Sequence, residues 1–414
     1  MYIQSDILPE IFTHAAAGSL PTLTSIRISH VCSQWRLVAL SISRLWNHFD
    51  YSLGIPIAKL QMSRVSPNVP ISLRISGWDI LDSDSHSERE YKMVRCPIQR
   101  WLTEAQIITF PRWNSLYLKL SGGGQRESVV KFFDMLSDRD DELDSLVIRL
   151  PNDLRSIPLN ATLAKLRFRP RHFGLASWDF PITELLEPLN HASSLYYEGW
   201  RRMTLTWLPP DHFTLPRLSH VIFRNSAAVD LSGIVIAPSL TSIYLHKSLQ
   251  VFPGTALVSL KPDMIHEFAP GLQHLQIIDI HSHLLLWMVP RCSLPSLLTL
   301  SVGRCDCPGG NEKSLVRALV NMDMSSTFPM LQKLTLQCVP TPSLEFEELL
   351  QSLPASTATF ILIRCPQSNT ISTDLMRGTH GINLSIQLSD GDLDSDWNFV
   401  NSGSTTGVGR GGQE

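Results

Sequence analysis

Some cysteine and histidine residues of this chain are close enough in the sequence that their side chains could bind a metal ion together. The relevant residues are Cys305 and Cys307, with Cys292 upstream, and the pair His281 and His283. A structural zinc site needs four ligands, which usually come from two close pairs, and no second Cys/His pair follows with that spacing. We therefore expect no metal and no cofactor, and interpret Cys305 as a turn residue and the histidines as surface residues.

Gly122, Gly123 and Gly124 could form a phosphate-binding loop. The run lacks the Gly-Lys-Ser/Thr ending that supplies the phosphate and magnesium contacts, so it indicates a turn between a strand and a helix near residues 129–136. The sequence contains no nucleophile elbow, zincin helix or dinucleotide fingerprint. We expect no catalytic residue and no enzymatic activity of the chain's own.

Several residues that can bind anions occupy outward-pointing positions of short apolar segments, which we predict to be strands. If these strands are neighbours, the residues form a basic stripe that could hold an acidic or phosphorylated target through charge-assisted hydrogen bonds. A solvated face, balanced by acids such as Asp144 and Glu198, is the alternative. The candidate target-binding residues are Tyr117, Lys119, Arg149, Arg167, Arg169 and Arg224.

The segments that carry these residues recur every 20 to 34 residues, roughly, as short Leu-rich clusters, a pattern typical of leucine-rich repeats. Each cluster predicts a short strand whose alternate side chains enter the core. Proline stands shortly before several clusters, where it ends the preceding return segment. A generic α/β domain is the alternative. The clusters are Leu116–Leu120, Leu143–Leu150, Leu163–Phe168, Leu218–Phe223, Leu240–Leu245, Leu272–Ile277, Leu297–Cys305, Leu331–Leu336 and Phe360–Cys365, and the prolines are Pro216, Pro238, Pro270, Pro295 and Pro329.

Residues 7–50 differ from the repeats because their apolar residues follow helical spacing. Ser5 or Asp6 can cap a first helix with Pro9 in its first turn, and Gly18 ends it. Three short helices of about fifty residues cannot bury all of their large apolar groups. Some apolar surface must therefore face a partner or the following domain, unless the helices only cap a larger domain.

The order and spacing of motifs in this segment resemble an F-box, especially in the large F-box families of mushroom-type fungi. The motifs are Leu8-Pro9-x-Ile11-Phe12, Val31-Cys32-x-x-Trp35-Arg36 and Leu45-Trp46. The resemblance implies that these residues build the face that binds a Skp-family adaptor, with Trp35 and Trp46 as anchors. The family usually has more residues before the Leu-Pro pair than the seven found here. The implied adaptor-binding residues are Leu8, Pro9, Ile11, Phe12, Val31, Cys32, Trp35, Arg36, Leu45 and Trp46.

The overall composition indicates a soluble protein with a large core. Apolar residues make up 43% of the 414 residues, and 35 basic residues nearly balance 38 acidic ones. This balance argues against a nucleic-acid or membrane partner. We find no signal-peptide pattern and no apolar run of the length a membrane helix needs, so we expect a cytoplasmic or nuclear protein with reduced cysteines.

We therefore predict an α/β fold: a three-helix F-box at 1–53, an irregular leucine-rich-repeat solenoid of short parallel strands at 54–388, and an acidic, then Gly/Ser-rich, disordered tail at 389–414. A polar surface loop is predicted at 79–92. The expected function is substrate recognition in a Skp–cullin–F-box ubiquitin ligase, with a Skp-family adaptor, the cullin ligase beyond it and an unknown target protein as partners. A repeat scaffold outside any ligase, whose F-box-like segment is only a structural cap, is the alternative.

Overall fold

The computed structural model describes residues 7–16, 21–78, 98–120, 132–150, 166–177, 186–199, 213–224, 235–246, 270–278, 294–303, 315–339, 343–363, 365 and 382–387. The chain divides into two compact units, the first formed mainly by residues 1–177 and the second mainly by residues 189–393. The division lies inside the stretch 54–388 that we predicted as repeats. The predicted loop at 79–92 and the predicted tail lie outside the described residues.

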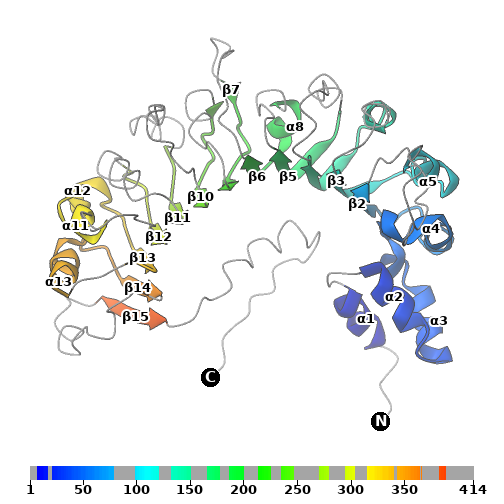
Figure 1. Cartoon of the computed structure of the whole chain (residues 1–414), viewed down its shortest axis with the longest axis horizontal. Helices are drawn as coiled ribbons and strands as arrows, with labels where there is room; N and C mark the ends of the chain where they lie inside the picture. Colours follow the sequence, from blue (N-terminus) through cyan, green and yellow to red (C-terminus); the bar gives the residue numbers. More distant parts are fainter. Residues whose placement is uncertain are drawn as a thin grey trace, which may run out of the picture. The chain divides into compact units, whose positions relative to one another are not determined.

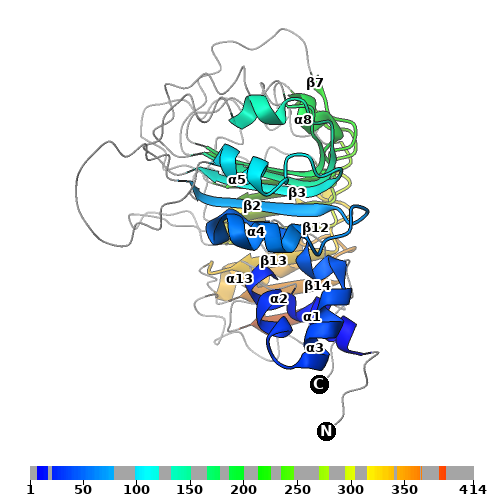
Figure 2. The ribbon, with the colours of Figure 1, turned by 90° about the vertical axis from the view of Figure 1, so that its right-hand side faces the viewer.

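The first unit begins with helices and continues into a parallel sheet (Figures 1 and 2). The helical elements are α1 (Leu8–Ala16), α2 (Pro21–Ser29), α3 (Ser33–Ser41), η1 (Ser43–Trp46), η2 (Tyr51–Leu53), α4 (Gly54–Met62) and α5 (Ile98–Glu104). The strands are β1 (His48–Asp50), β2 (Ile71–Trp78), β3 (Trp113–Leu120), β4 (Glu142–Arg149) and β5 (Arg169–Ser177). They pair in chain order, and each pair is parallel.

The second unit continues the strand-and-return pattern. Its main sheet contains, in this order, β6 (Ser194–Gly199), β8 (His220–Arg224), β10 (Ser242–His246), β11 (His274–Ile278), β12 (Thr299–Gly303), β13 (Lys333–Gln337), β14 (Thr359–Ile363) and β15 (Asn383–Gln387). These neighbours are parallel as well. The short strands β7 (Phe213–Thr214) and β9 (Val235–Ile236) pair separately. Helix α8 (Leu186–His191) spans the boundary between the units.

Helices α11 (Leu315–Val320), α12 (Met324–Thr327) and α13 (Ser343–Ser352) form returns on one side of the second sheet (Figure 1). Alternate strand residues face them and build the core, as in the register row Leu300, Leu334 and Phe360, all of which are buried. The protein therefore has an α/β, solenoid-like fold with N-terminal helices, as the sequence predicted.

A proline turn precedes several strands of the second unit and explains where these strands begin. Leu218 N–H donates to Leu215 O at 3.4 Å, and Leu240 N–H donates to Ala237 O at 3.0 Å, across turns that contain Pro216 and Pro238. Proline is favoured in this position because its fixed φ suits the second residue of a turn. The same bond closes the turns that contain Pro295 and Pro329, at 3.1 and 3.0 Å.

Two strand assignments from the sequence need correction. The cluster Leu163–Phe168 precedes the strand, and β5 itself begins at Arg169. Leu166 and Phe168 are nevertheless buried, because they belong to the core beside the sheet. Strand β6 was missed altogether because its core positions are Leu195 and Tyr197, and tyrosine does not fit an aliphatic repeat template.

Candidate functional site

The N-terminal helices enclose a core built from residues that the sequence placed on an adaptor-binding surface. Leu8, Phe12, Leu45 and Trp46 are between 0 and 1% exposed and pack together with Ala16, Ile28 and Ala39. The indole N–H of Trp46 donates to Ala39 O at 2.9 Å, and the Arg64 guanidinium lies 4.1 Å from the ring centroid. These four side chains therefore fill the interior of the bundle, and their contact with an adaptor stays a prediction.

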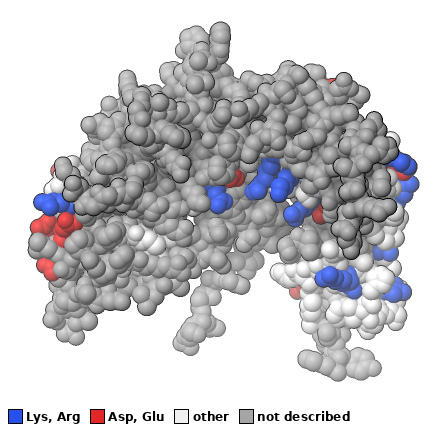
Figure 3. Space-filling view, viewed as in Figure 1, with Lys and Arg blue, Asp and Glu red and all other residues white. Residues whose placement is uncertain are grey.

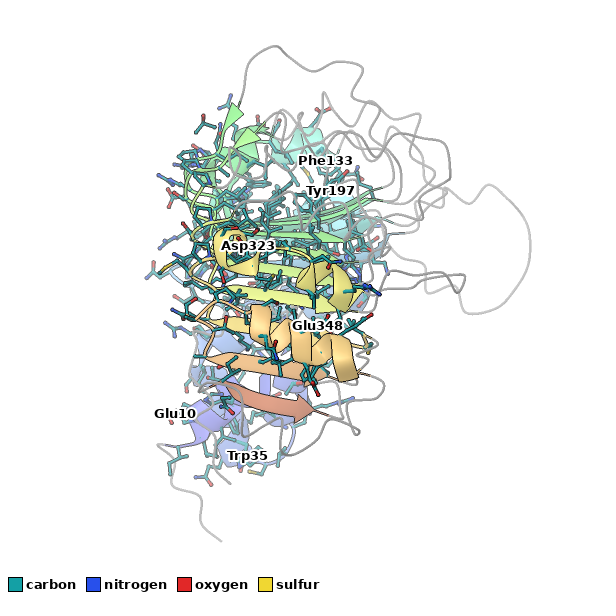
Figure 4. All side chains as sticks on the ribbon, turned by 90° about the vertical axis from the view of Figure 1, so that its left-hand side faces the viewer. Glu10, Trp35, Phe133, Tyr197, Asp323 and Glu348 are labelled. Carbon is teal, nitrogen blue, oxygen red and sulfur yellow. The ribbon has the colours of Figure 1, made fainter. Side chains whose placement is uncertain are left out.

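The Val-Cys-x-x-Trp-Arg motif has a local structural cause. Cys32 is the N-cap of α3, and its Sγ accepts a hydrogen bond from the Trp35 N–H at 3.4 Å. Arg36 Nε donates to Ser29 O at 3.0 Å, which ties the end of α2 to the start of α3. Trp35, labelled in Figure 4, is half-buried with its ring centroid 4.9 Å from that of Phe12. These residues set the angle at which α3 packs.

Exposed apolar side chains concentrate on the same helices. Five of the seven large apolar side chains that are exposed in the described residues belong to this segment. Ile11 on α1 and Val31 between α2 and α3 are among the predicted adaptor-binding residues. Ile7, Leu37 and Leu40 are not among them. Their exposed fractions are 47% for Ile7, 41% for Ile11, 60% for Val31, 71% for Leu37 and 38% for Leu40.

The missed residues carry a signal in the sequence that motif matching does not use. On α3, Trp35, Val38 and Ala39 follow helical spacing toward the core, and Leu37 and Leu40 fall out of that phase. Leucine at an out-of-phase position indicates a surface that packs against something else. The facing surface of these helices in Figure 3 is mostly free of charged groups, apart from a few basic ones.

The proposed target-binding residues divide among three places. Lys119 and Arg149 are register partners at the ends of β3 and β4, and Tyr117 lies one outward position earlier on β3. Arg169 pairs instead with Asp140 and Glu142, at 3.2 Å each, at the start of β5. Arg167 precedes the same strand end, so neither it nor Arg169 joins the group. Arg224 belongs to β8 of the second unit, in register with Glu198 and His246.

The triglycine run, the three spaced cysteines and the paired histidines are outside the described residues. Within the described part of the chain, no three His, Cys, Asp or Glu side chains are grouped so that they could hold a metal ion. None of the described helices combines the length and the apolar character needed to cross a membrane.

Beside the helices, His48 gives the first unit a pH-dependent stability. Burial lowers the pKa of the His48 ring to about 4, from about 6.5 when exposed. Protonation of His48 therefore favours the unfolded chain. The contribution of the neutral His48 ring to the stability of the fold is complete above pH 6.5 and is lost as the pH falls toward 4. Urea unfolding should show that the free energy of unfolding falls by about 2 kcal/mol between about pH 7.5 and pH 5, and that this fall is absent in His48→Gln. If the free energy of unfolding falls equally with pH in the native protein and in His48→Gln, the assignment to His48 is wrong.

Comparisons with known proteins place the chain in no family. No family model matches it, and no curated protein matches it. One solved structure with detectable likeness is a protein from Bacteroides fragilis, at 12% identity and a TM-score of 0.39, over 71% of this chain and 70% of that one. The described strands and helices by themselves define the class, an α/β protein with a solenoid-like parallel sheet and an N-terminal helical segment.

Proposed function

We propose that this protein is a substrate receptor of a Skp–cullin–F-box ubiquitin ligase. The observation that carries the proposal is the concentration of exposed apolar side chains on residues 7–40, within a segment that has the F-box motif order. Large apolar side chains gathered on one short segment are typical of protein-binding surfaces. The docking surface is defined as Ile7, Ile11, Val31, Leu37 and Leu40.

The pattern of exposure supports docking by surface residues rather than by the motif tryptophans. Ile7 lies directly before α1, and its carbonyl accepts a hydrogen bond from the N–H of Ile11 on α1 at 3.1 Å. Leu37 and Leu40 are three residues apart on α3 and share one side of that helix. Exposed basic residues, Arg27 and Arg36, lie on the same segment and suit the polar rim of an interface. The preferred partner is therefore a protein with an apolar groove and an acidic border, as the adaptor role requires.

The mechanism is proximity and needs no catalytic residue in this chain. The docking surface attaches the receptor to the adaptor and thus to the cullin ligase, while the parallel-strand repeats hold a target. Holding the target near the ubiquitin-carrying enzyme raises the effective concentration of the reacting groups. Repeats suit this role because they offer an extended surface whose outward residues can vary without loss of the core.

Leu37→Asp tests the proposal with little risk to folding, because Leu37 is 71% exposed. We expect it to weaken adaptor binding by about 2 kcal/mol or more, roughly 30-fold, since a charge would be buried in the interface. The measurement is co-purification of the full chain with a Skp-family adaptor. Met330→Asp is the matched control, because Met330 is also exposed, at 52%, but belongs to the second unit.

A repeat scaffold outside any ligase remains the second candidate. The observation in its favour is the burial of Leu8, Phe12 and Trp46, which makes the helices a stable cap in their own right. A well-folded full chain that does not co-purify with the adaptor would favour the scaffold. A complex that survives both Leu37→Asp and Val31→Asp would show that the docking surface lies elsewhere.

A further inference from the structure

Two histidines stand on the outward face of the second unit's sheet, one on each side of a serine. His220 opens β8, Ser242 opens β10 and His274 opens β11. Both histidines are register partners of Ser242 on the neighbouring strands (Figure 1). Their backbones are therefore two strand spacings apart, about 9.5 Å. His220 is exposed and His274 is half-buried, so both rings can be reached by a ligand.

A hydrogen bond orients each histidine ring through the same nitrogen. The Ser219 hydroxyl donates to Ser193 O at 2.9 Å, so it accepts the 2.7 Å hydrogen bond that His220 Nδ1 makes with it. Nδ1 of His274 lies 2.8 Å from Thr299 Oγ1. Metal-binding histidines are typically held in this way, by a hydrogen bond to the ring nitrogen that does not bind the metal. In both rings, Nε2 is the nitrogen that remains to bind a metal.

The two imidazole rings are close enough to interact electrostatically. Burial and the charge of His274 both lower the pKa of His220, so that the His220 ring is neutral at neutral pH. Ser242 lies between the two histidines on the outward face and is only 2% exposed, which is the burial expected where two rings lean over it. The pair therefore offers ring nitrogens for a metal ion above a buried serine.

Uncharged residues flank the histidine pair. The next register partners in the row are Ser194 on β6 and Thr299 on β12. Lys333 lies one strand beyond Thr299, and Glu198 and Arg224 are in register with each other near the far end of their strands. Within the described residues, no third His, Cys, Asp or Glu joins the pair in a metal-binding group. The protein therefore supplies two ligands and leaves the other coordination positions to water.

We propose that His220 and His274 bind one Zn²⁺ ion through their Nε2 atoms. Zinc accepts imidazole nitrogen at about 2.0–2.1 Å and prefers four ligands in a tetrahedral arrangement. With two protein ligands, we expect a dissociation constant on the order of 10 μM. The sequence did not predict this site, because the two histidines are far apart in the chain and only the strand register brings them together. The proposal does not depend on the receptor function proposed above.

The test measures zinc binding to the full chain, purified without a histidine tag, by competition with a chromophoric zinc chelator. We expect His220→Ala and His274→Ala each to weaken the binding of one zinc ion by about tenfold or more, with an unchanged melting temperature. Thr299→Val removes the hydroxyl beside His274 Nδ1 and should weaken the same ion by roughly tenfold. His14→Ala is the matched control, since it removes an exposed histidine of the first unit, and should change nothing.

Three results would overturn the proposal. One is zinc binding that stays the same in both His220→Ala and His274→Ala. Another is a loss in only one of these two variants, which would indicate a single surface histidine and no shared site. The third is loss of the ion in the double variant His281→Ala/His283→Ala, which would assign the zinc to that histidine pair instead.

Discussion

Replacing Trp46 with alanine is expected to unfold the N-terminal helical segment, at a cost of about 3–5 kcal/mol. The side chain is 0% exposed and is the largest group in the core shared by α1, α2 and α3. Its removal leaves a cavity, removes the indole N–H that donates to Ala39 O and removes the ring on which Arg64 lies. Urea unfolding followed by circular dichroism measures the loss.

Trp46→Phe separates the two parts of this effect. It keeps most of the apolar volume and loses the 2.9 Å hydrogen bond to Ala39 O, so we expect a smaller loss of about 1–2 kcal/mol. If Trp46→Ala keeps the stability of the native protein and loses only adaptor binding, Trp46 belongs to the interface and the packing described for the helices is wrong.

Arg139→Ala is expected to destabilise the first unit by about 3–5 kcal/mol, because it leaves a largely buried carboxylate without its cation. The Arg139 guanidinium donates to Ile108 O at 2.5 Å and to Phe110 O at 3.0 Å. It also pairs with Asp141, with an N–O distance of 2.6 Å, and lies 4.2 Å from the Trp113 ring centroid. This one side chain links the segment after α5 to β3 and to the start of β4.

Arg139→Lys is the matched control, since it keeps the charge and loses the planar fork. We expect it to recover less than half of the lost stability, because one ammonium group cannot reach both carbonyls and the carboxylate. The measurement is the midpoint of urea unfolding for both variants. Equal stability of Arg139→Ala and the native chain would mean that these contacts are replaced by water at no cost.

The repeat pattern predicted the fold well where aliphatic residues occupy the core positions of a strand. Leu116 and Leu118 on β3, and Leu334 and Leu336 on β13, are buried as the alternation required. The prediction failed at β5, where the core positions of the strand are Phe173 and Leu175 and the preceding Leu166 and Phe168 resemble another strand. The apolar pattern therefore predicted correctly that Leu166 and Phe168 are buried, but it did not show whether they belong to a strand.

The candidate sites were predicted only in part, for the same reason. Motif matching selects residues that recur in sequences sharing the motif, whether they recur for packing or for binding. In these helices the motif residues Leu8, Phe12, Leu45 and Trp46 fill the core. Ile11 and Val31 were selected and are exposed, whereas Leu37 and Leu40 required a comparison of helix phase. Among the basic residues, only register shows that Lys119 and Arg149 are neighbours and that Arg169 is held by Asp140 and Glu142.

The measurement that tests the central claim most directly is the dissociation constant between the purified full chain and a purified Skp-family adaptor, obtained by isothermal titration calorimetry. The receptor function predicts a one-to-one complex with a dissociation constant of about 1 μM or lower, and a negative heat-capacity change from burial of the docking surface. Absence of detectable heat with folded protein at about 50 μM, confirmed at a second temperature, would contradict the receptor function.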